Sequence, residues 1–215
     1  NAAATAGPGP IAGPIAGTGP TAAPTAGPIA ATGAAAPSGA NTVAGLDTSH
    51  LAGARVLLTG GTGFVGRHLL PQLLAAGAQV TCLTRASSHT GHLPRGVAVA
   101  QADLASGQGL AQALEGQDVV IHMAALLFGL GWQDYLRANA CAAHSLAQAC
   151  QAADQTADRA ADRTCENSPH TQRGALRRFV LVSSLAATGP CGTQPGVQDN
   201  ALPAPVSAYG WSKML

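Results

Sequence analysis

The stretch that decides the fold is RVLLTGGTGFVGRHLLPQLLAAGAQVTCLTR, residues 55–85. Its first five residues form a short apolar run, which is typical of a buried parallel strand. Glycines follow in the pattern T-G-x-x-G-x-x-G, and then apolar residues recur at helical spacing. A second apolar run, QVTCLT, closes the stretch. The sequence therefore predicts a strand, a glycine turn, a helix that ends at Gly77 and a second strand.

The glycine turn has the spacing that binds a dinucleotide. Gly60 lets the chain leave the strand sharply, Gly63 lets a diphosphate approach the backbone, and Gly66 lets the helix pack closely on the sheet. An overlapping G-x-G-x-x-G pattern begins at Gly61. The free N–H groups at the start of the helix would face the phosphates. The predicted cofactor contacts in this turn are Gly60, Gly63, Phe64, Val65 and Gly66.

Composition excludes several classes of protein. The 215 residues carry a formal charge of +1 and suffice for one α/β core, and the balanced charge argues against nucleic acid or an anionic membrane as partner. The five cysteines are irregularly spaced without a C-x-x-C, which favours reduced thiols and a cytoplasmic location. No apolar run is long enough to span a bilayer. Neither the H-x-x-H at residues 89–92 nor Cys141 with His144 has further ligands nearby, so no metal site is predicted.

Residues 1–46 contain no charged side chain and consist mostly of Ala, Gly, Pro, Thr and Ile in loose repeats. Proline and glycine oppose regular structure there, and too little apolar surface is available to offset the loss of chain entropy. We therefore expect a disordered low-complexity tail over residues 1–46, followed by a dinucleotide-binding domain over residues 53–215.

Beyond residue 85, apolar runs alternate with helical patterns. The alternation, without tight hairpins, predicts a Rossmann-like, doubly wound parallel sheet. His122 is expected to be a core histidine with its hydrogen bonds satisfied. The predicted strands are GVAVAQADL, DVVIHMAA and RRFVLVSS. The predicted helices run from about residue 107 to 114, from Trp132 to about Ala153 and into the polar insertion Asp154–Gly174, and from Ser207 onwards.

Thr84 and Arg85, at the end of the second strand, bear on the choice of cofactor. An acidic residue there would bind the adenosine ribose of NAD. Arginine instead pairs with a 2′-phosphate through parallel N–H bonds. The sequence therefore favours NADP over NAD, and the alternative is a solvated surface arginine.

Tyr209 and Lys213 carry the predicted chemistry. Lys213 is the single lysine and lies four residues after Tyr209, which places both side chains on one face of a helix. A free phenol is a poor base at neutral pH, but a neighbouring ammonium favours the phenolate. The pair then acts as a general acid or base for a hydroxyl–carbonyl conversion, and Ser184 holds the same substrate oxygen. A surface Tyr–Lys pair without function is the alternative.

The motifs TGGTGFVG, Asp103–Leu104, HMAA, Asn139, VLVSSLAATGP and Y-G-W-S-K, in this order, resemble the extended branch of the short-chain dehydrogenase/reductases. The resemblance covers about residues 55–215. It implies Tyr209 as proton donor or acceptor, Lys213 as its activator and as a ligand of the nicotinamide ribose, and Ser184 rather than Ser183 as partner of the substrate oxygen. It further implies cofactor contacts by Asp103, Leu104, Ala124, Ala125 and Asn139.

Two departures from that family bear on function. The insertion at residues 154–174 is longer and more polar than usual. The family also continues past Y-x-x-x-K, so we expect a C-terminally truncated chain that holds the cofactor half.

The expected activity is NADP-dependent hydride transfer between the nicotinamide and a small-molecule carbonyl or secondary alcohol. The alternatives are a nucleotide-sugar epimerase or dehydratase that retains NAD(P), a non-catalytic NADP-binding fragment, and a non-functional remnant. A homodimer is possible for the full-length form.

Overall fold

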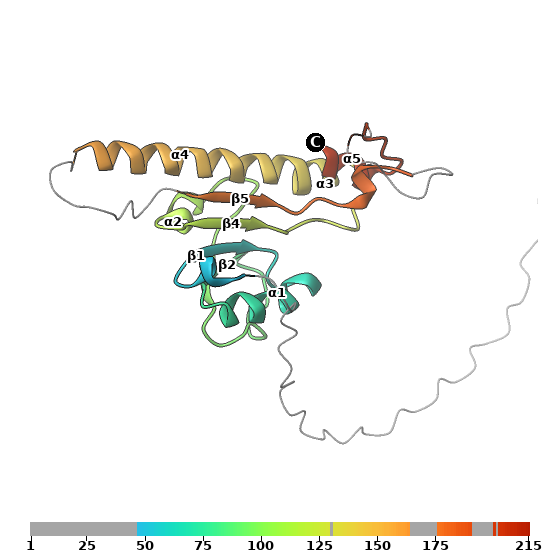
Figure 1. Ribbon diagram of the computed structural model, residues 1–215. Coiled ribbons are helices and arrows are strands. Elements are labelled where there is room, and N and C mark those ends of the chain that lie inside the picture. Colours follow the sequence, from blue (N-terminus) through green and yellow to red (C-terminus); the bar gives the residue numbers. More distant parts are fainter. Residues whose placement is uncertain (1–46, 130, 164–175, 191–199, 201) are drawn as a thin grey trace, which may run out of the picture. The chain divides into compact units, whose positions relative to one another are not determined.

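Five parallel strands form one sheet in the order β3-β2-β1-β4-β5 (Figure 1). The computed structural model describes residues 47–129, 131–163, 176–190, 200 and 202–215. The predicted tail and the later part of the predicted insertion lie outside these residues. The strands are β1 (Arg55–Thr59), β2 (Gln79–Thr84), β3 (Ala98–Gln101), β4 (Val119–His122) and β5 (Arg178–Leu181). The predicted Rossmann-like, doubly wound sheet is confirmed.

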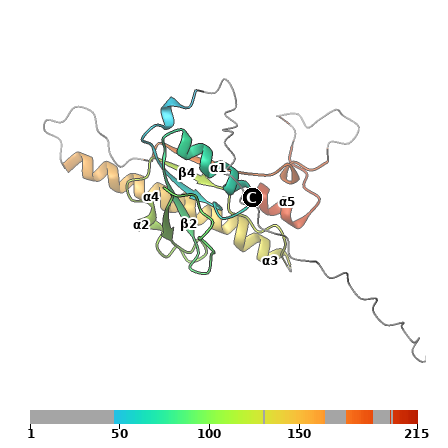
Figure 2. The ribbon, with the colours of Figure 1, turned by 90° about the horizontal axis from the view of Figure 1, so that it is seen from below.

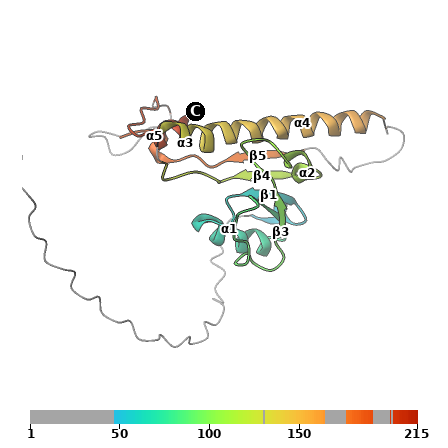
Figure 3. The ribbon, with the colours of Figure 1, turned by 180° about the vertical axis from the view of Figure 1, so that it is seen from behind.

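Helices cover both faces of this sheet. In Figures 1 and 3, α4 lies along one face and α1 along the other, and in the view from below α1 lies in front of the strands (Figure 2). The helices are α1 (Phe64–Ala75), α2 (Leu110–Leu114), α3 (Trp132–Tyr135), the π-helix η2 (Leu136–Cys141), α4 (Ala142–Arg163) and α5 (Ala208–Met214), with short 3₁₀ turns η1 (Ser49–Leu51) and η3 (Leu185–Ala187).

The hydrophobic core has two parts, one on each face of the sheet, and alternate side chains of β1 belong to each. Val56 and Leu58 are fully buried and pack with Leu70 of α1. Leu57, which lies between them in sequence, faces the opposite side and packs with Leu146 of α4. Successive residues of a strand point to opposite faces, so one apolar run supplies both halves of the core.

Several elements differ from the predicted bounds. Strands β3, β4 and β5 are shorter than predicted at both ends, and most of the difference lies at their carboxyl ends, where the last predicted residues belong to the loops. The helix predicted from residue 107 begins at Leu110, since Gly107 and Gly109 adopt φ values of +77° and +80°. The run predicted from Trp132 contains an unexpected π-helix at Leu136–Cys141, and it continues to Arg163, as predicted for the first part of the insertion.

Candidate active site

The carboxyl edge of the sheet gathers the residues predicted to act. All five strands are parallel, so the loops that follow them leave from the same edge. Figure 1 shows α5 at this end, beside the loops that follow β4 and β5. The glycine turn follows β1, Arg85 follows β2, Asp103 follows β3, Ala124 and Ala125 follow β4, and Ser183 and Ser184 follow β5.

The glycine turn requires glycine at two positions for steric reasons. Gly60 has φ +76°, and a Cβ there would stand 2.7 Å from the Ala124 nitrogen. A Cβ on Gly66 would meet the Gly61 carbonyl oxygen and stand 2.6 Å from the Gly60 carbonyl oxygen. The chain therefore turns tightly between β1 and α1, and the first turn of α1 packs directly on the backbone of the loop.

The entrance to α1 is open to a ligand. Gly63 is the N-cap residue, and its N–H donates to the Gly60 carbonyl oxygen at 3.1 Å. Phe64 and Val65, the first two helical residues, are 71% and 59% exposed. Main-chain N–H groups in a first helical turn have no partner within the helix and carry a partial positive charge. The turn and these exposed N–H groups fit a dinucleotide diphosphate, and glycine at positions 60 and 66 is what lets the backbone turn this tightly.

Arg85 and Asp103 lie near one another beyond β2 and β3. Arg85 is exposed. The Asp103 carboxylate accepts hydrogen bonds from the Ala105 N–H and the Ser106 hydroxyl, both at 2.9 Å. These bonds hold the pKa of the Asp103 carboxyl below its usual value, and the Arg85 charge adds to the effect. Asp103 thus stabilises its own turn and interacts electrostatically with Arg85.

Two side chains that sequence reasoning did not assign to the site support the glycine turn. The His92 imidazole lies 3.2 Å from the Thr62 carbonyl oxygen, so the loop after β2 is tied to the turn. Cys82 lies beneath the turn, where a Cβ on Gly61 would stand 2.5 Å from its sulfur. Burial raises the pKa of the Cys82 thiol. Neither contact has a local sequence signal, because each depends on how β2 packs beside β1.

His122 ends β4 and is 1% exposed, which confirms the predicted core position. Its Nδ1 lies 2.6 Å from the Thr59 hydroxyl oxygen, which also accepts the Ala124 N–H at 3.1 Å. Its Nε2 is buried without a hydrogen-bond partner among the described residues, so only one of the two ring nitrogens is satisfied. Burial, with a smaller contribution from the Lys213 charge, lowers the pKa of His122 to about 4.

Acidification is expected to destabilise the fold through His122. An unfolded histidine titrates near 6.5, whereas folded His122 titrates at about 4, so the unfolded state binds the proton more readily between these values. The contribution of neutral His122 to the free energy of unfolding is therefore fully present above pH 6.5 and is lost as the pH falls towards 4. The expected loss between pH 7 and pH 5 is about 2 kcal/mol. Urea unfolding at both pH values measures it.

The His122→Gln variant is expected to show a smaller pH dependence than the wild type, whatever its absolute stability. His89→Gln is the matched control, because His89 is exposed. An equal loss of stability in His122→Gln and the wild type would contradict this assignment.

Asn139 joins the loop after β4 to α5. It is 3% exposed and lies in the π-helix. Its carboxamide oxygen accepts the Leu126 N–H at 2.6 Å, and its nitrogen donates to the Leu126 carbonyl oxygen at 3.1 Å and to the Ser212 hydroxyl at 2.9 Å. Ser212 in turn donates to the Tyr209 carbonyl oxygen at 2.8 Å. The cofactor contact assigned to Asn139 stays a prediction, and the structure adds that its polar atoms are engaged within the protein.

Helix α5 carries Tyr209 and Lys213. The Ser207 hydroxyl caps the helix by accepting the Gly210 N–H at 3.0 Å. A Cβ on Gly210 would meet the Ala186 carbonyl oxygen, so α5 packs directly on η3. Tyr209 and Lys213 are both half-buried, and burial lowers the pKa of the Lys213 ammonium. The close packing on η3 fixes α5 beside the end of β5.

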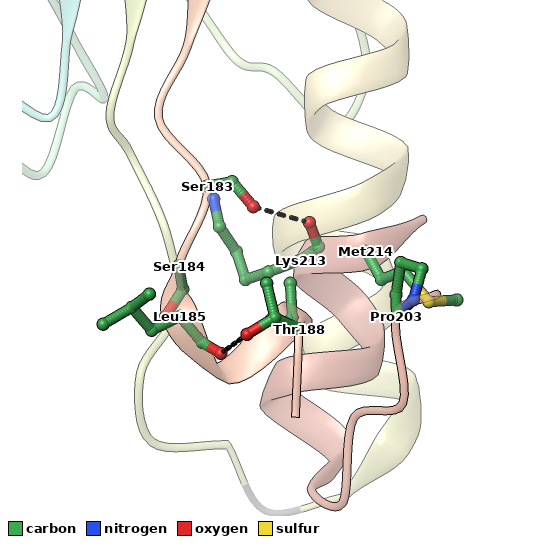
Figure 4. A pocket seen from close by; sticks show the side chains of 8 residues that line it. Ser183, Ser184, Leu185, Thr188, Pro203, Lys213 and Met214 are labelled. Carbon is green, nitrogen blue, oxygen red and sulfur yellow. Dashed lines mark hydrogen bonds between the residues drawn. The ribbon is translucent and has the colours of Figure 1, made fainter. Parts of the chain in front are cut away.

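Lys213 and the two serines line a hollow of about 520 Å³ (Figure 4). The Ser183 hydroxyl donates to the Lys213 carbonyl oxygen at 3.2 Å. The Ser184 oxygen accepts the Ala186 N–H at 3.2 Å, which leaves its hydroxyl hydrogen free to donate. Tyr209 is not among the residues that line this hollow. The other lining residues are Leu185, Ala187, Thr188, Pro203 and Met214.

Across the described residues, no three His, Cys, Asp or Glu side chains gather closely enough to hold a metal ion. Among the helices described here, none combines the length and the apolar character that crossing a bilayer requires.

Comparison with known proteins gives consistent matches. A sequence model of the NAD dependent epimerase/dehydratase family matches residues 56–215. The chain is 33% identical over 136 residues to the ceramide reductase of Caulobacter vibrioides, which covers 63% of this chain and 36% of that protein. It is 38% identical over 73 residues to the sterol-4-alpha-carboxylate 3-dehydrogenase, decarboxylating, of Dictyostelium discoideum, which covers 34% of this chain and 22% of that protein. The solved structure of MoeE5 in complex with UDP-glucose and NAD matches with a TM-score of 0.54 and 30% identity, over 75% of this chain and 46% of that one.

The family match extends from β1 to the last residue and includes the glycine turn, the serines after β5 and α5. The chain therefore belongs to the NAD dependent epimerase/dehydratase family, and the resemblance to extended short-chain dehydrogenase/reductases is confirmed. The chain spans less than half the length of the relatives compared above.

Proposed function

We propose that the protein is an NADP-dependent oxidoreductase that transfers hydride between the nicotinamide and a carbonyl or secondary alcohol. The observation that carries the proposal is the arrangement after β5. Ser184 and Lys213 line one hollow there, and α5 carries Tyr209 one turn before Lys213. The glycine turn lies at the same sheet edge. One edge thus combines a diphosphate cradle with hydroxyl, phenol and ammonium groups.

The chain would hold the cofactor along the carboxyl edge. The bound nicotinamide supplies the hydride acceptor or donor. The start of α1 would bind the diphosphate, and Lys213 would bind the nicotinamide ribose. Ala124 and Ala125 would border the central part of the cofactor, and Asp103 and Leu104 would border the adenine.

Tyr209 would move the proton. In reduction, its hydroxyl donates a proton to the carbonyl oxygen as the carbonyl carbon gains hydride, and in oxidation its phenolate removes the proton from the alcohol. Lys213 lies one helical turn after Tyr209 on α5 and is half-buried. Ser184 would hold the substrate oxygen, because its hydroxyl hydrogen is free whereas that of Ser183 is donated to a carbonyl.

Arg85 supports NADP over NAD. Arg85 is exposed at the end of β2. Neither Thr84 nor Arg85 has the carboxylate that would bind the ribose hydroxyls of NAD, whereas the Arg85 guanidinium can pair with a 2′-phosphate. NAD is the alternative cofactor, because the solved structure of MoeE5 is a complex with NAD and the family is described as NAD dependent. Asp103 is the local group that would weaken the hold of Arg85 on a 2′-phosphate, since the two side chains interact electrostatically.

A nucleotide-sugar epimerase or dehydratase is the second candidate. It is favoured by the match to MoeE5, whose solved structure is a complex with UDP-glucose. In such an enzyme the hydride returns within one turnover and the cofactor stays bound. The relatives named as a ceramide reductase and a sterol dehydrogenase favour net oxidation or reduction. A non-catalytic NADP-binding fragment is the third candidate.

The expected homodimer and the expected cytoplasmic location stay predictions.

Net cofactor oxidation by the full-length protein tests the proposal. With a keto-lipid or ketosteroid as substrate, we expect NADPH to be oxidised faster than NADH, and Arg85→Glu to lose this preference by about 10- to 100-fold, because a charged pair with the 2′-phosphate is lost. Absorbance at 340 nm measures both rates. Arg95→Glu is the charge-matched control, since Arg95 is also exposed.

Faster oxidation of NADH by the wild type would contradict the NADP assignment. Epimerisation of a nucleotide sugar without net cofactor oxidation would favour the second candidate. Tight NADPH binding without turnover of any carbonyl would favour the third.

A further inference from the structure

Tyr135 and Tyr209, the two tyrosines of the chain, lie ring against ring at the carboxyl edge. Their ring centroids are 6.3 Å apart and their planes meet at 63°. This is the edge-to-face arrangement that aromatic pairs prefer. Tyr135 is the last residue of α3 and Tyr209 is the second residue of α5, so the contact joins two helices that are distant in sequence.

Tyr135 is held by the loop that follows β4. Its hydroxyl donates to the Leu127 carbonyl oxygen at 3.2 Å. A Cβ on Gly129 would stand 3.2 Å from its Cε2 atom, so the loop backbone passes close along the ring. The same loop contains Ala124 and Ala125, which are predicted to border the cofactor. The Tyr135 ring is therefore fixed on the loop and presented to Tyr209.

One helical turn after Tyr135, Asn139 also contacts both the loop after β4 and α5. Asn139 lies four residues after Tyr135, and it bonds Leu126 of the loop and Ser212 of α5. The segment Tyr135–Asn139 thus contacts both the loop and α5 at two points each. Helix α5 has seven residues, which is too short for a helix to be stable alone. The placement of Tyr209 therefore depends on contacts of this kind.

We infer that Tyr135 is a positioning residue for Tyr209. Its ring sets the orientation of the Tyr209 phenol, and its hydroxyl ties that orientation to the loop expected to border the cofactor. The consequence for catalysis rests on the proposed function, whereas the contact between the rings does not. Tyr135 itself is not assigned a proton transfer, because its hydroxyl is donated to the Leu127 carbonyl.

The presence of two tyrosines makes the contact directly testable. In Tyr135→Phe and Tyr135→Met, ring-labelled tyrosine reports Tyr209 alone by NMR. Phenylalanine keeps the ring, and methionine fills the space without one. We expect the Tyr209 ring signals to stay near their wild-type positions in the Phe variant and to be displaced and broadened in the Met variant. Trp132→Leu removes another aromatic of α3 and should leave the Tyr209 signals in place.

Undisplaced Tyr209 signals in a folded Met variant would overturn the inference. Thermal unfolding establishes that each variant folds, and Tyr135→Leu replaces the Met variant should that one not fold. The Leu variant is read in the same way, with displaced signals supporting the inference and undisplaced signals overturning it.

Turnover by the full-length protein supplies the second readout. We expect Tyr135→Met to lower kcat on the order of 10- to 100-fold, because the phenol is misaligned, with the KM for NADPH changed by less than about twofold. Tyr135→Phe should recover most of the activity. A wild-type kcat in the Met variant would overturn the positioning role while leaving the proposed function intact. Displaced Tyr209 signals in a protein whose wild type reduces no carbonyl would instead contradict the proposed function and leave the contact standing.

Discussion

Replacing Gly66 with alanine is expected to destabilise the fold by about 3 kcal/mol and to weaken dinucleotide binding about 100-fold or more. The new Cβ would meet the Gly61 carbonyl oxygen and stand 2.5 Å from the Gly61 Cα. These are backbone atoms of a tight turn, so the start of α1 must move away from β1. The N–H groups at the start of α1 would then be displaced from the diphosphate. Urea unfolding and fluorescence titration with NADPH measure the two effects.

Two other glycines separate the steric effect from the binding effect. Gly63 has φ −86°, and a Cβ there would lie 3.3 Å from the Gly60 carbonyl oxygen. We expect Gly63→Ala to keep the fold and to lose cofactor affinity, because the methyl group would stand where a phosphate approaches. Gly91→Ala, with no atom within 4 Å of its Cβ, is the control that should change neither quantity. Wild-type NADPH affinity in Gly66→Ala would show that the diphosphate is bound elsewhere.

The glycine turn was predictable because its cause is local. Three glycines at fixed spacing lie between an apolar run and an amphipathic helix, and this pattern predicts a tight turn. The structure shows the close contacts at Gly60 and Gly66 that the pattern implies. The doubly wound sheet was predictable for a related reason. Alternation of buried runs and helical patterns leaves few topologies once crossovers are right-handed.

Contacts that depend on packing between distant segments were not predictable. His122 was expected to have its hydrogen bonds satisfied, but its Nε2 has no partner among the described residues, because the neighbours of a buried ring depend on the packing around the sheet. The π-helix around Asn139 has no composition signal, since LRANAC also suits an α-helix. The pairing of Tyr135 with Tyr209 likewise requires knowing that α3 and α5 meet.

Replacing Tyr209 with phenylalanine is expected to lower kcat of the full-length protein by about 100- to 10,000-fold, the usual contribution of a general acid or base. The ring and its contact with Tyr135 are kept, so the affinity for NADPH should change by less than about twofold. Lys213→Met should lower both kcat and cofactor affinity, because Lys213 is expected to bind the nicotinamide ribose as well as to favour the phenolate. Initial rates and fluorescence titrations measure the difference between the two variants.

Trp211→Phe is the matched control on the same helix, since Trp211 is 46% exposed and lines no part of the hollow. Wild-type turnover in Tyr209→Phe would assign the proton transfer to another group. His122 is unsuited to that role at neutral pH, because it is buried, it lies within hydrogen-bonding distance of Thr59, and its pKa is about 4. Tyr135 is unsuited because its hydroxyl is donated to a carbonyl, and the residue four positions later is Asn139, not a lysine. Of the two tyrosines, Tyr209 is the one with a lysine ammonium one helical turn away. The proposed mechanism therefore requires the Tyr209 hydroxyl, and its removal should abolish most of the turnover.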